Sequence, residues 1–558
     1  MFRKIGWQVL LVGIGFLASA VILFYMAATY NTEFRPAPGG TYVESVGGYP
    51  QSLNPLLSFY NDADNDVVSL VYSGLTRLGM YGEVEPDLAV GWEIDFSGIT
   101  YTFKLNRSAL WHDGAYVTAD DVLFTTSLLQ DPDYPGPPDI GALWRSVQVI
   151  RVDDYTVQFA LAQPYAPFLD YTTIPLLPAH RLSGIRAAML PSLEFNRDPI
   201  GTGPFRVAER IETQEGQITQ VTLRRFPRYY GEAPYIENIL LRFYPTPRAA
   251  FEAYQDGLVE GISRIPTELL PEAFAEPNLN LHSATTSEMV MVYLNSFVTD
   301  TLTFDDTRVR QALFYGLDRQ ALVDNVLMGQ AVLPETPLLP GTWAYSTEGV
   351  HTYRHDIAQA QSLLADAGWT REWVTDTLRD ASGQPFAFSL LVANEQQDLA
   401  IARALVAQWS RLGISVTLEG VPPLALSGVL ESRTYQAALA RLVIPGDPDP
   451  YPFWHETQAL PGQGQNYAGF RDRRISEIVE EARITVNRER RLQLYQEFQQ
   501  RFMEEVPALP LFVPVYTYGV DARVNGEQIG PLMHTGDRFR TIANWYVLQR
   551  RVVVSIQE

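Results

Sequence analysis

The chain has 558 residues, of which 46% are hydrophobic and 19% charged, and it carries a formal net charge of −22. This composition indicates about two to four folded units rather than a disordered chain, and the negative charge argues against binding to nucleic-acid phosphates. Because cysteine is absent, disulfides, zinc thiolates, thiol nucleophiles and a lipidated cysteine anchor are excluded.

The N-terminal segment predicts a membrane anchor. No charged residue lies between Lys4 and Glu33, and most of residues 5–32 are apolar. About 20 helical residues span the hydrocarbon core, whereas a cleaved signal peptide has an apolar stretch of about 7–15 residues. Positive charge before the run favours a cytoplasmic N-terminus and a body on the other side of the membrane. We therefore expect residues 1–37 to be a cytoplasmic stub, a transmembrane helix and a linker, with cleavage near Ala28 as the alternative.

The first half of the body shows strand and helix patterns in alternation. Residues 41–46 and 99–105 alternate apolar and polar side chains, which is typical of half-buried strands. Thr118 and Asp121 have the spacing of a capping box, in which each side chain bonds the other residue's backbone amide. An apolar run follows them, so we expect a helix to begin there.

The second half repeats the alternation. Asp306 and Asp356 each precede an apolar pattern of helical period and predict helix N-termini. Apolar residues at 401–412 form another helical stripe, which Gly413 closes as the left-handed residue after the helix. The alternation at 414–418 predicts a strand. Helix, glycine and strand in this order indicate an α/β fold.

Strings that support catalysis are not found. The chain has no Gly-x-Ser-x-Gly string, and Gly201-Thr202-Gly203 is followed by a proline, which lacks the amide that a phosphate cradle needs. His351 and His355 have metal-ligand spacing but lack the glutamate of a zinc protease motif. Trp111-His112-Asp113-Gly114 is interpreted as a turn whose histidine is satisfied by its neighbours. We therefore predict a protein that is not an enzyme and holds neither metal nor cofactor, and whose aromatic residues (12%) partly line a pocket for an organic ligand.

Several short strings occur in an order that resembles a known family. They are Ser-Leu-Asn-Pro-Leu-Leu at 52–57, Val-Tyr-Ser-Gly-Leu-Thr at 71–76, Glu-Pro-Asp-Leu-Ala-Val-Gly-Trp at 85–92, Trp-His-Asp-Gly at 111–114, Gly-Thr-Gly-Pro-Phe at 201–205 and Val-Arg-Gln-Ala-Leu at 309–313. Their order and spacing resemble the extracellular solute-binding protein family 5. This family contains the dipeptide-, oligopeptide- and nickel-binding components of ABC importers.

The resemblance implies an α/β clamp of two lobes, with an extra subdomain in the first lobe. We expect the first lobe at 38–290 with its subdomain at about 80–200, the second lobe at 291–504, and a C-terminal segment at 505–558 that returns to the first lobe. It implies a monomer that captures a peptide-like or other small organic solute outside the cytoplasm. The closed clamp then delivers the solute to ABC permease subunits in the membrane.

The resemblance also implies ligand-binding residues. These are Tyr49, Gly203, Tyr293, Asn295, Arg441, Asp447, Asn466 and Tyr467. Peptide binders of the family hold the ligand's amine with an acidic residue shortly before the Asp-Pro-Asp string, whereas residues 440–445 contain no acid and one arginine. A buried arginine favours an anionic or carboxylate-bearing ligand, so a standard dipeptide is not the expected best ligand.

Three alternatives stay open at this point. A membrane-anchored sensor or chaperone could use the same clamp, and sequence does not separate it from an importer component. An anchored hydrolase needs a catalytic pair that we do not find. A nickel chelate is a less favoured ligand than an organic solute, although one histidine and a chelating small molecule suffice for it.

Overall fold

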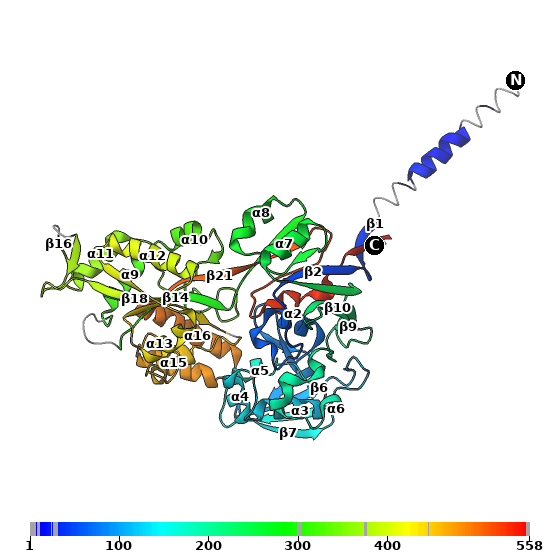
Figure 1. The fold of residues 1–558 in the computed structure, drawn as a ribbon, viewed down its shortest axis with the longest axis horizontal. Helices are drawn as coiled ribbons and strands as arrows, with labels where there is room; N and C mark the ends of the chain where they lie inside the picture. The colour runs from blue at the N-terminus through cyan, green and yellow to red at the C-terminus, as the bar shows by residue number, and fades with distance from the viewer. Residues whose placement is uncertain are drawn as a thin grey trace.

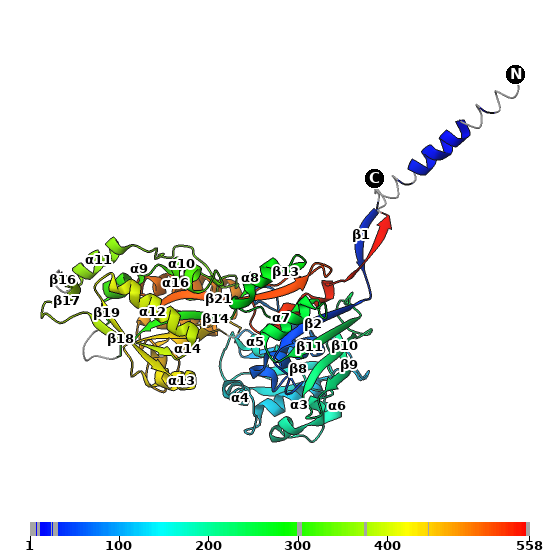
Figure 2. The same cartoon turned by 45° about the horizontal axis from the view of Figure 1, so that its top comes forward.

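The computed structural model describes residues 7, 12–23, 25, 32–297, 304–372, 376–444 and 446–553. Figure 1 and Figure 2 show two lobes that lie side by side, with the long strand β21 (Ala508–Asp521) running from one into the other. Helices and strands alternate along the chain in both lobes. The predicted α/β fold with two lobes is therefore confirmed.

A 12-stranded sheet of the described chain continues through both lobes, in the order β19-β18-β20-β14-β21-β12-β2-β11-β10-β9, with β13 and β15 also paired to β21. Its first-lobe strands are β2 (Thr41–Gly47), β9 (Phe205–Glu212), β10 (Ile218–Arg225), β11 (Asn238–Tyr244), β12 (Gly261–Ile262) and β13 (Leu279–Thr285). Its second-lobe strands are β14 (Glu288–Leu294), β15 (Ala331–Val332), β18 (Ala387–Ala393), β19 (Ser415–Val421) and β20 (Ala437–Val443). Because β13 and β14 pair with successive parts of β21, the chain passes between the lobes at 285–288 and again within β21.

The first lobe carries a second layer built on a separate antiparallel sheet. Its strands are β5 (Ala89–Ile94), β6 (Thr100–Leu105), β8 (Thr156–Ala160) and β7 (Gln148–Asp153), in that order. The helices of this lobe are α2 (Asp62–Val71), α3 (Ala119–Gln130), α4 (Pro138–Arg145), α5 (Phe168–Tyr171), α6 (Ala179–Leu182), α7 (Pro247–Gln255) and α8 (Leu270–Ala275). The first lobe also contains a short hairpin and three 3-10 turns that lie near the cavity described below. The hairpin strands are β3 (Thr76–Leu78) and β4 (Val84–Pro86), and the turns are η1 (Ser58–Tyr60), η6 (Thr535–Phe539) and η7 (Ile542–Asn544). The separate sheet falls in the range where we predicted the inserted subdomain, whose boundaries stay a prediction.

The second lobe packs helices against its part of the long sheet. They are α9 (Thr307–Tyr315), α10 (Arg319–Val326), α11 (Ile357–Asp366), α12 (Gln396–Ser410), α13 (Pro423–Ser432), α14 (Tyr451–Trp454), α15 (Arg473–Ile484) and α16 (Arg488–Glu505). A small hairpin of β16 (Thr370–Glu372) and β17 (Thr377–Arg379) lies at its far end (Figure 1). One hydrophobic core extends from Met289 to Val513, whereas Tyr516 to Trp545 return to the first-lobe core.

The local predictions for the body are confirmed. Thr118 and Asp121 form the capping box at the start of α3. Asp306 and Asp356 accept backbone amides at the starts of α9 and α11. Gly413 has φ +85° after α12, a left-handed conformation that glycine adopts without the steric cost that a Cβ brings.

The N-terminal predictions have a different outcome. No helix in the described ranges combines the length and apolarity that crossing a membrane needs. Within the predicted anchor at 5–32, the structure describes residues 7, 12–23, 25 and 32. The rest of the anchor lies outside the described residues. The predicted linker at the end of 1–37 contains strand β1 (Thr32–Ala37), which we did not predict and whose backbone pairs antiparallel with β22 (Leu548–Val553).

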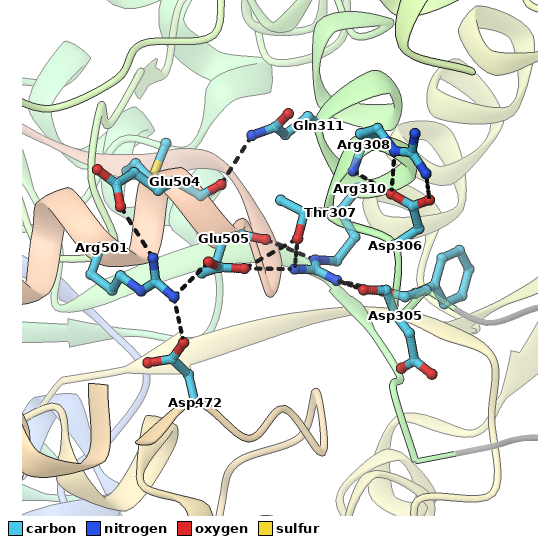
Figure 3. A network of polar contacts seen from close by, with 12 residues as sticks. Asp305, Asp306, Thr307, Arg308, Arg310, Gln311, Asp472, Arg501, Glu504 and Glu505 are labelled. Atoms are coloured by element: carbon cyan, nitrogen blue, oxygen red, sulfur yellow. Dashed lines mark hydrogen bonds and ion pairs between the residues drawn. The ribbon is translucent and has the colours of Figure 1, made fainter. Parts of the chain in front are cut away.

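A polar network joins the ends of two second-lobe helices (Figure 3). Buried Arg310 of α9 donates to the carbonyl oxygens of Phe304 (Nη1, 2.7 Å) and Glu505 (Nε, 2.8 Å). Its Nη2 lies 3.3 Å from the Glu505 carboxylate, which Arg501 of α16 also contacts at 2.7 Å. The side chain thus supplies a donor for the Glu505 carbonyl, which the C-terminal end of α16 leaves without a helix partner, and ties it to the segment before α9.

Candidate functional site

A cavity of about 690 Å³ lies in the first lobe. Its wall is formed by α2, by β3 with the loop after it, by residues 173–175 after α5, and by η6 and η7. Pockets for small organic ligands are typically about 300–1,000 Å³. The cavity therefore has room for a ligand of this class.

A buried ion triad holds the wall together. Arg538 of η6 donates to Glu44 of β2 (Nε to Oε1, 2.9 Å) and to Asp66 of α2 (Nη1 to Oδ1, 2.6 Å), and all three side chains are buried. The hydroxyls of Tyr42 and Tyr518 each lie 2.6 Å from Glu44. Burial disfavours the charged guanidinium, but the two carboxylates outweigh it and raise the pKa of Arg538. The triad thereby joins β2 and α2 to η6, almost 500 positions later in the chain. The cavity wall is therefore held in place by the protein itself.

The cavity wall is unevenly charged. Its described residues contribute five carboxyl groups and two guanidinium groups, which belong to Glu85, Asp87, Asp170, Glu232, Asp537, Arg77 and Arg540. Both arginines are occupied within the wall, because Arg77 donates to Glu85 (3.2 Å) and Arg540 donates to Asp537 (2.6 Å). The remaining carboxyl groups make the cavity a poor site for an anion and a favourable one for a cationic group.

Asp87 lines the cavity next to aromatic side chains. It accepts a hydrogen bond from the hydroxyl of Tyr230, whose ring centroid is 4.7 Å from that of Tyr229. Burial raises the pKa of Asp87 to about 6, although Tyr230 and the positive charge of Arg77 oppose the shift. This carboxyl group therefore changes charge close to neutral pH, in a pocket that also offers ring surface.

Asp170 lies where the cavity reaches the second lobe. Its Oδ1 is buried and has no hydrogen-bond partner among the described residues. A Cβ placed on Gly446 of the second lobe would lie 3.0 Å from this oxygen. Beyond Gly446, the carboxylate of Asp447 is paired with Arg491 of α16 at 2.5 and 2.8 Å. The cavity thus ends at a contact between the lobes.

Further contacts join the lobes beside Asp170. The amide of Ala166 donates to the carbonyl of Arg483 at 2.8 Å. The Arg483 guanidinium lies 5.0 Å from the ring centroid of Tyr165 in the first lobe and 4.3 Å from that of Tyr451 in the second. Its Nε lies 3.4 Å from the carboxylate of Asp449. The contact between the lobes is therefore made of paired charges and aromatic faces from both of them.

Four of the predicted ligand-binding residues lie together inside the second lobe. The ring of Tyr293 is stacked 6.2 Å from Trp454 and meets the ring of Tyr467 edge-on at 5.6 Å. Asn295 donates to the carbonyls of residues 433 and 435 (3.0 and 2.6 Å), and Asn466 donates to the carbonyl of residue 470 (2.8 Å). Tyr293, Asn295 and Asn466 are buried. In this arrangement they hold the lobe together, and ligand contact stays a prediction for them.

Arg441 does not support the expected preference for an anion. Its guanidinium makes a two-bond ion pair with Asp398 of α12 at 2.8 and 2.9 Å, and its Nε lies 3.6 Å from Glu288. Two carboxylates already balance its charge. The expectation of an anionic ligand depended on Arg441 as a buried arginine, and its ion pair with Asp398 removes that support.

Of the remaining predicted residues, Asp447 of the second lobe is paired with Arg491, and Tyr49 and Gly203 belong to the first lobe. The carbonyl of Tyr49 accepts from Asn61 at 3.1 Å, which holds the start of α2. A Cβ on Gly203 would lie 2.7 Å from the carbonyl oxygen of Leu70, so only glycine fits against the end of α2. Within the described residues the cavity lining includes none of the eight predicted positions.

The lining residues that carry charge were missed by the sequence analysis. Asp87 stands in one of the family-like strings, Glu-Pro-Asp-Leu-Ala-Val-Gly-Trp at 85–92, and this string was the one signal available for it. Asp170 lies in a short helix without a motif. Its charged neighbours belong to the second lobe, nearly 280 positions later in the chain. No local sequence pattern predicts a contact over that separation.

Comparisons with known proteins agree with this geometry. Residues 83–463 match the family described as Bacterial extracellular solute-binding proteins, family 5 Middle. The chain is 29% identical to the oligopeptide-binding protein AppA of Bacillus subtilis (strain 168) over 512 residues, which cover 89% of this chain and 90% of that protein. The AppA structure with a nonapeptide aligns with TM-score 0.66 and 26% identity, covering 92% of this chain and 100% of that one. The structure of NikZ from Campylobacter jejuni with Ni(L-His) aligns with TM-score 0.67 and 25% identity, covering 91% and 99%.

Proposed function

This chain belongs to the bacterial extracellular solute-binding proteins of family 5, and from this premise we propose that it captures a peptide-like or other small organic solute with a positively charged group. The protein is the solute-binding component of an ABC importer and delivers its solute to permease subunits. The observation that carries the proposal is a 690 Å³ cavity that is rich in carboxyl groups and ends at the contact between two lobes.

The two lobes supply the mechanism of capture. A ligand shifts a conformational equilibrium only by its differential affinity for the two states. A solute in the cavity lies beside Asp170 and the second-lobe segment at Gly446, so it gains contacts when the lobes approach. Hinge motion at 285–288 and within β21 would bring them together.

The charge of the wall decides the ligand class. Carboxyl groups outnumber guanidinium groups there, and both arginines are already paired. We therefore replace the expected anionic ligand by one that carries an ammonium or other cationic group, with the aromatic lining taking its apolar part. The relatives reported above are binding proteins by name, which supports a role in binding rather than catalysis.

The location and the lobe boundaries are part of the same proposal. We place the body outside the cytoplasm, as the family description states for its members, and we retain a single N-terminal anchor within 5–32. We also retain the division into 38–290, 291–504 and 505–558. Intact-mass analysis of the protein from membranes tests the anchor, because a mature chain that starts beyond residue 28 contradicts it.

Native mass spectrometry of the chain purified without refolding tests the function. A tight ligand survives purification and also stabilises the protein by RT ln(1 + [L]/Kd). We expect a discrete adduct that dissociates on denaturation and is identified as a peptide or amine. If the protein carries no adduct, a thermal-shift screen of peptides, amines, sugars and dicarboxylates replaces it, and stabilisation by sugars or dicarboxylates alone contradicts the proposal.

A further inference from the structure

We propose that the two-stranded ribbon of β1 and β22 docks on anionic lipid headgroups at the membrane surface through Arg35, Arg550 and Arg551. This inference rests on the N-terminal anchor of the proposed function. It goes beyond that anchor by assigning a second, electrostatic contact between the protein and the membrane.

The ribbon has the opposite charge to the chain as a whole. Residues 32–37 and 548–553 contain three arginines and one acidic residue, Glu33, so the ribbon has a formal charge of +2. The whole chain carries −22, and all three arginines are exposed. An anionic surface therefore repels the chain as a whole but attracts the ribbon.

Two of the arginines lie directly opposite each other. Arg35 of β1 is the register partner of Arg550 of β22, so their side chains leave the same face of the ribbon with Cβ atoms about 4.5–5.5 Å apart. Like charges in this position destabilise a strand pair. Glu33 lies 3.5 Å from Arg35 with both side chains more than half exposed, whereas the Arg550 guanidinium has no partner among the described residues. A lipid phosphate relieves the repulsion, because guanidinium groups bind phosphate through planar two-bond contacts.

The other face of the ribbon combines an aromatic ring with a cation. Phe34 is the register partner of Arg551, whose guanidinium carbon lies 5.1 Å from the centroid of the ring. Phe34 is 62% exposed. Ring surface is favourable at the boundary between headgroups and acyl chains, where anionic lipids also attract arginine. Both faces of the ribbon thus offer groups that suit a lipid surface.

The ribbon also begins where the proposed anchor ends. Its first residue is Thr32, the last residue of the anchor segment 5–32. A strand rises about 3.3 Å per residue, so Arg35 and its partner Arg550 lie within about 10 Å of the end of the anchor. This distance is close to the Debye length of about 8 Å at physiological ionic strength. Figure 1 and Figure 2 show the ribbon projecting from the first lobe toward the helix at 12–23.

A single fluorophore in the ribbon tests the contact. Because the chain has no cysteine, Gln549→Cys gives one labelling site at an exposed ribbon position. The full chain is reconstituted into vesicles that carry a quencher on the lipid headgroups. We expect the ratio of quenched to unquenched fluorophore to be at least about fivefold higher with one quarter phosphatidylglycerol than with phosphatidylcholine alone. Salt at about 1 M should abolish the difference, because it shortens the Debye length to about 3 Å.

Substitutions in the labelled chain test the arginines. A variant with Arg35→Gln, Arg550→Gln and Arg551→Gln should lose the dependence on phosphatidylglycerol. The corresponding variant with Arg35→Lys, Arg550→Lys and Arg551→Lys keeps the charge and should retain the dependence. Melting temperatures equal to that of the parent chain verify that each variant is folded.

The matched control removes the same charge from the body. Arg145→Gln, Arg181→Gln and Arg186→Gln replace three exposed arginines of the first lobe and should leave the quenching unchanged. A glutamine ribbon variant that still responds to phosphatidylglycerol overturns the proposal. Quenching that rises with the density of protein instead of with phosphatidylglycerol also overturns it, in favour of a contact between two copies of the chain.

Flotation of the vesicles tests the anchor separately. A chain that floats with phosphatidylcholine alone is held by an inserted segment, whatever the ribbon does. Flotation with both lipid mixtures but no fluorophore response overturns the ribbon contact and leaves the anchor intact. Flotation only with phosphatidylglycerol, lost in the glutamine variant, overturns the anchor and supports the ribbon contact. A chain that floats with neither mixture overturns both.

Discussion

Arg538 and Asp170 are enclosed charged residues of the same lobe with opposite surroundings. Arg538 is fully buried and has two carboxylates at hydrogen-bond distance, whereas Oδ1 of Asp170 has no partner in the described chain. A buried charge needs a partner. Arg538 therefore has a structural role that is complete in the protein alone. Burial instead raises the pKa of Asp170 well above its ordinary value, which favours its protonated form.

His112 shows a third case, a buried base that stays neutral. Its Nδ1 accepts from the amide of Gly201 at 3.2 Å, and its Nε2 lies 3.1 Å from the carbonyl of Gly203, which assigns the proton to Nε2. Burial lowers the pKa of His112 to about 4. The histidine thus holds the Gly201–Gly203 turn, whose residues lie 89 and 91 positions further along the chain.

The depressed pKa of His112 predicts acid sensitivity. Between pH 6.5 and 4 the imidazole is protonated in the unfolded chain but neutral in the folded chain. The free energy of unfolding therefore decreases as pH falls, by up to about 3 kcal/mol. His112→Gln should lower stability at pH 7.5 but lose this part of the pH dependence, as measured by urea unfolding at several pH values. His351→Gln, at an exposed imidazole, is the control. Equal slopes in His112→Gln and wild type would falsify the assignment.

At the scale of elements, the ends of helices α9 and α16 depend on each other. Figure 3 shows Arg310 reaching from α9 to the last residues of α16, while Arg308 on the same helix binds Asp306 at the surface. Both are arginines two positions apart, but Arg310 is 1% exposed and Arg308 is exposed. Position on the helix therefore separates a structural residue from a solvated one.

Replacing these two arginines tests that distinction. Arg310→Leu removes the donors for the carbonyls of residues 304 and 505 and should cost about 2–3 kcal/mol of unfolding free energy. Arg308→Leu should leave stability close to that of the wild type, since exposed ion pairs contribute little. The comparison uses urea unfolding followed by circular dichroism. Equal losses for both variants would show that the Arg310 network has no special role.

At the scale of the whole molecule, β21 is the element that makes two lobes one protein. Its first part pairs with β14 in the second lobe, and its last part pairs with β13 and β12 in the first. Away from this strand the lobes meet again beside the cavity, where the amide of Ala166 donates to the carbonyl of Arg483. This second contact lies outside the sheet, so separating it leaves the strand pairs of β21 intact.

A disulfide across the second contact should lock the lobes together. The chain has no cysteine, and the hydrogen bond between residues 166 and 483 brings two backbones close enough for a bridge. The oxidised Ala166→Cys, Arg483→Cys variant should bind added ligand at least about tenfold more slowly and release trapped ligand more slowly. Dithiothreitol should restore both rates. Single-cysteine variants are the controls, and unchanged rates after confirmed bridging would show that this contact does not gate the cavity.

The sequence by itself determined the local elements and the family. Capping pairs at Thr118 and Asp356 and the glycine at 413 act over a few residues, so short-range physics predicts them. The order of the short strings between residues 52 and 313 was sufficient to identify the family resemblance. The resemblance in turn predicted a fold of two lobes. The strand at 32–37 was not predicted, because its partner lies some 510 positions away.

The tertiary structure alone decided which charges are available to a ligand. The sequence analysis expected Arg441 to favour an anionic ligand, but α12 places Asp398 against it. Asp170 gave no signal, and the other lobe surrounds it with charges that are already paired. The energy of a charge depends on what lies within a few ångströms in space. Those neighbours come from distant parts of the chain, so only the folded molecule identifies them.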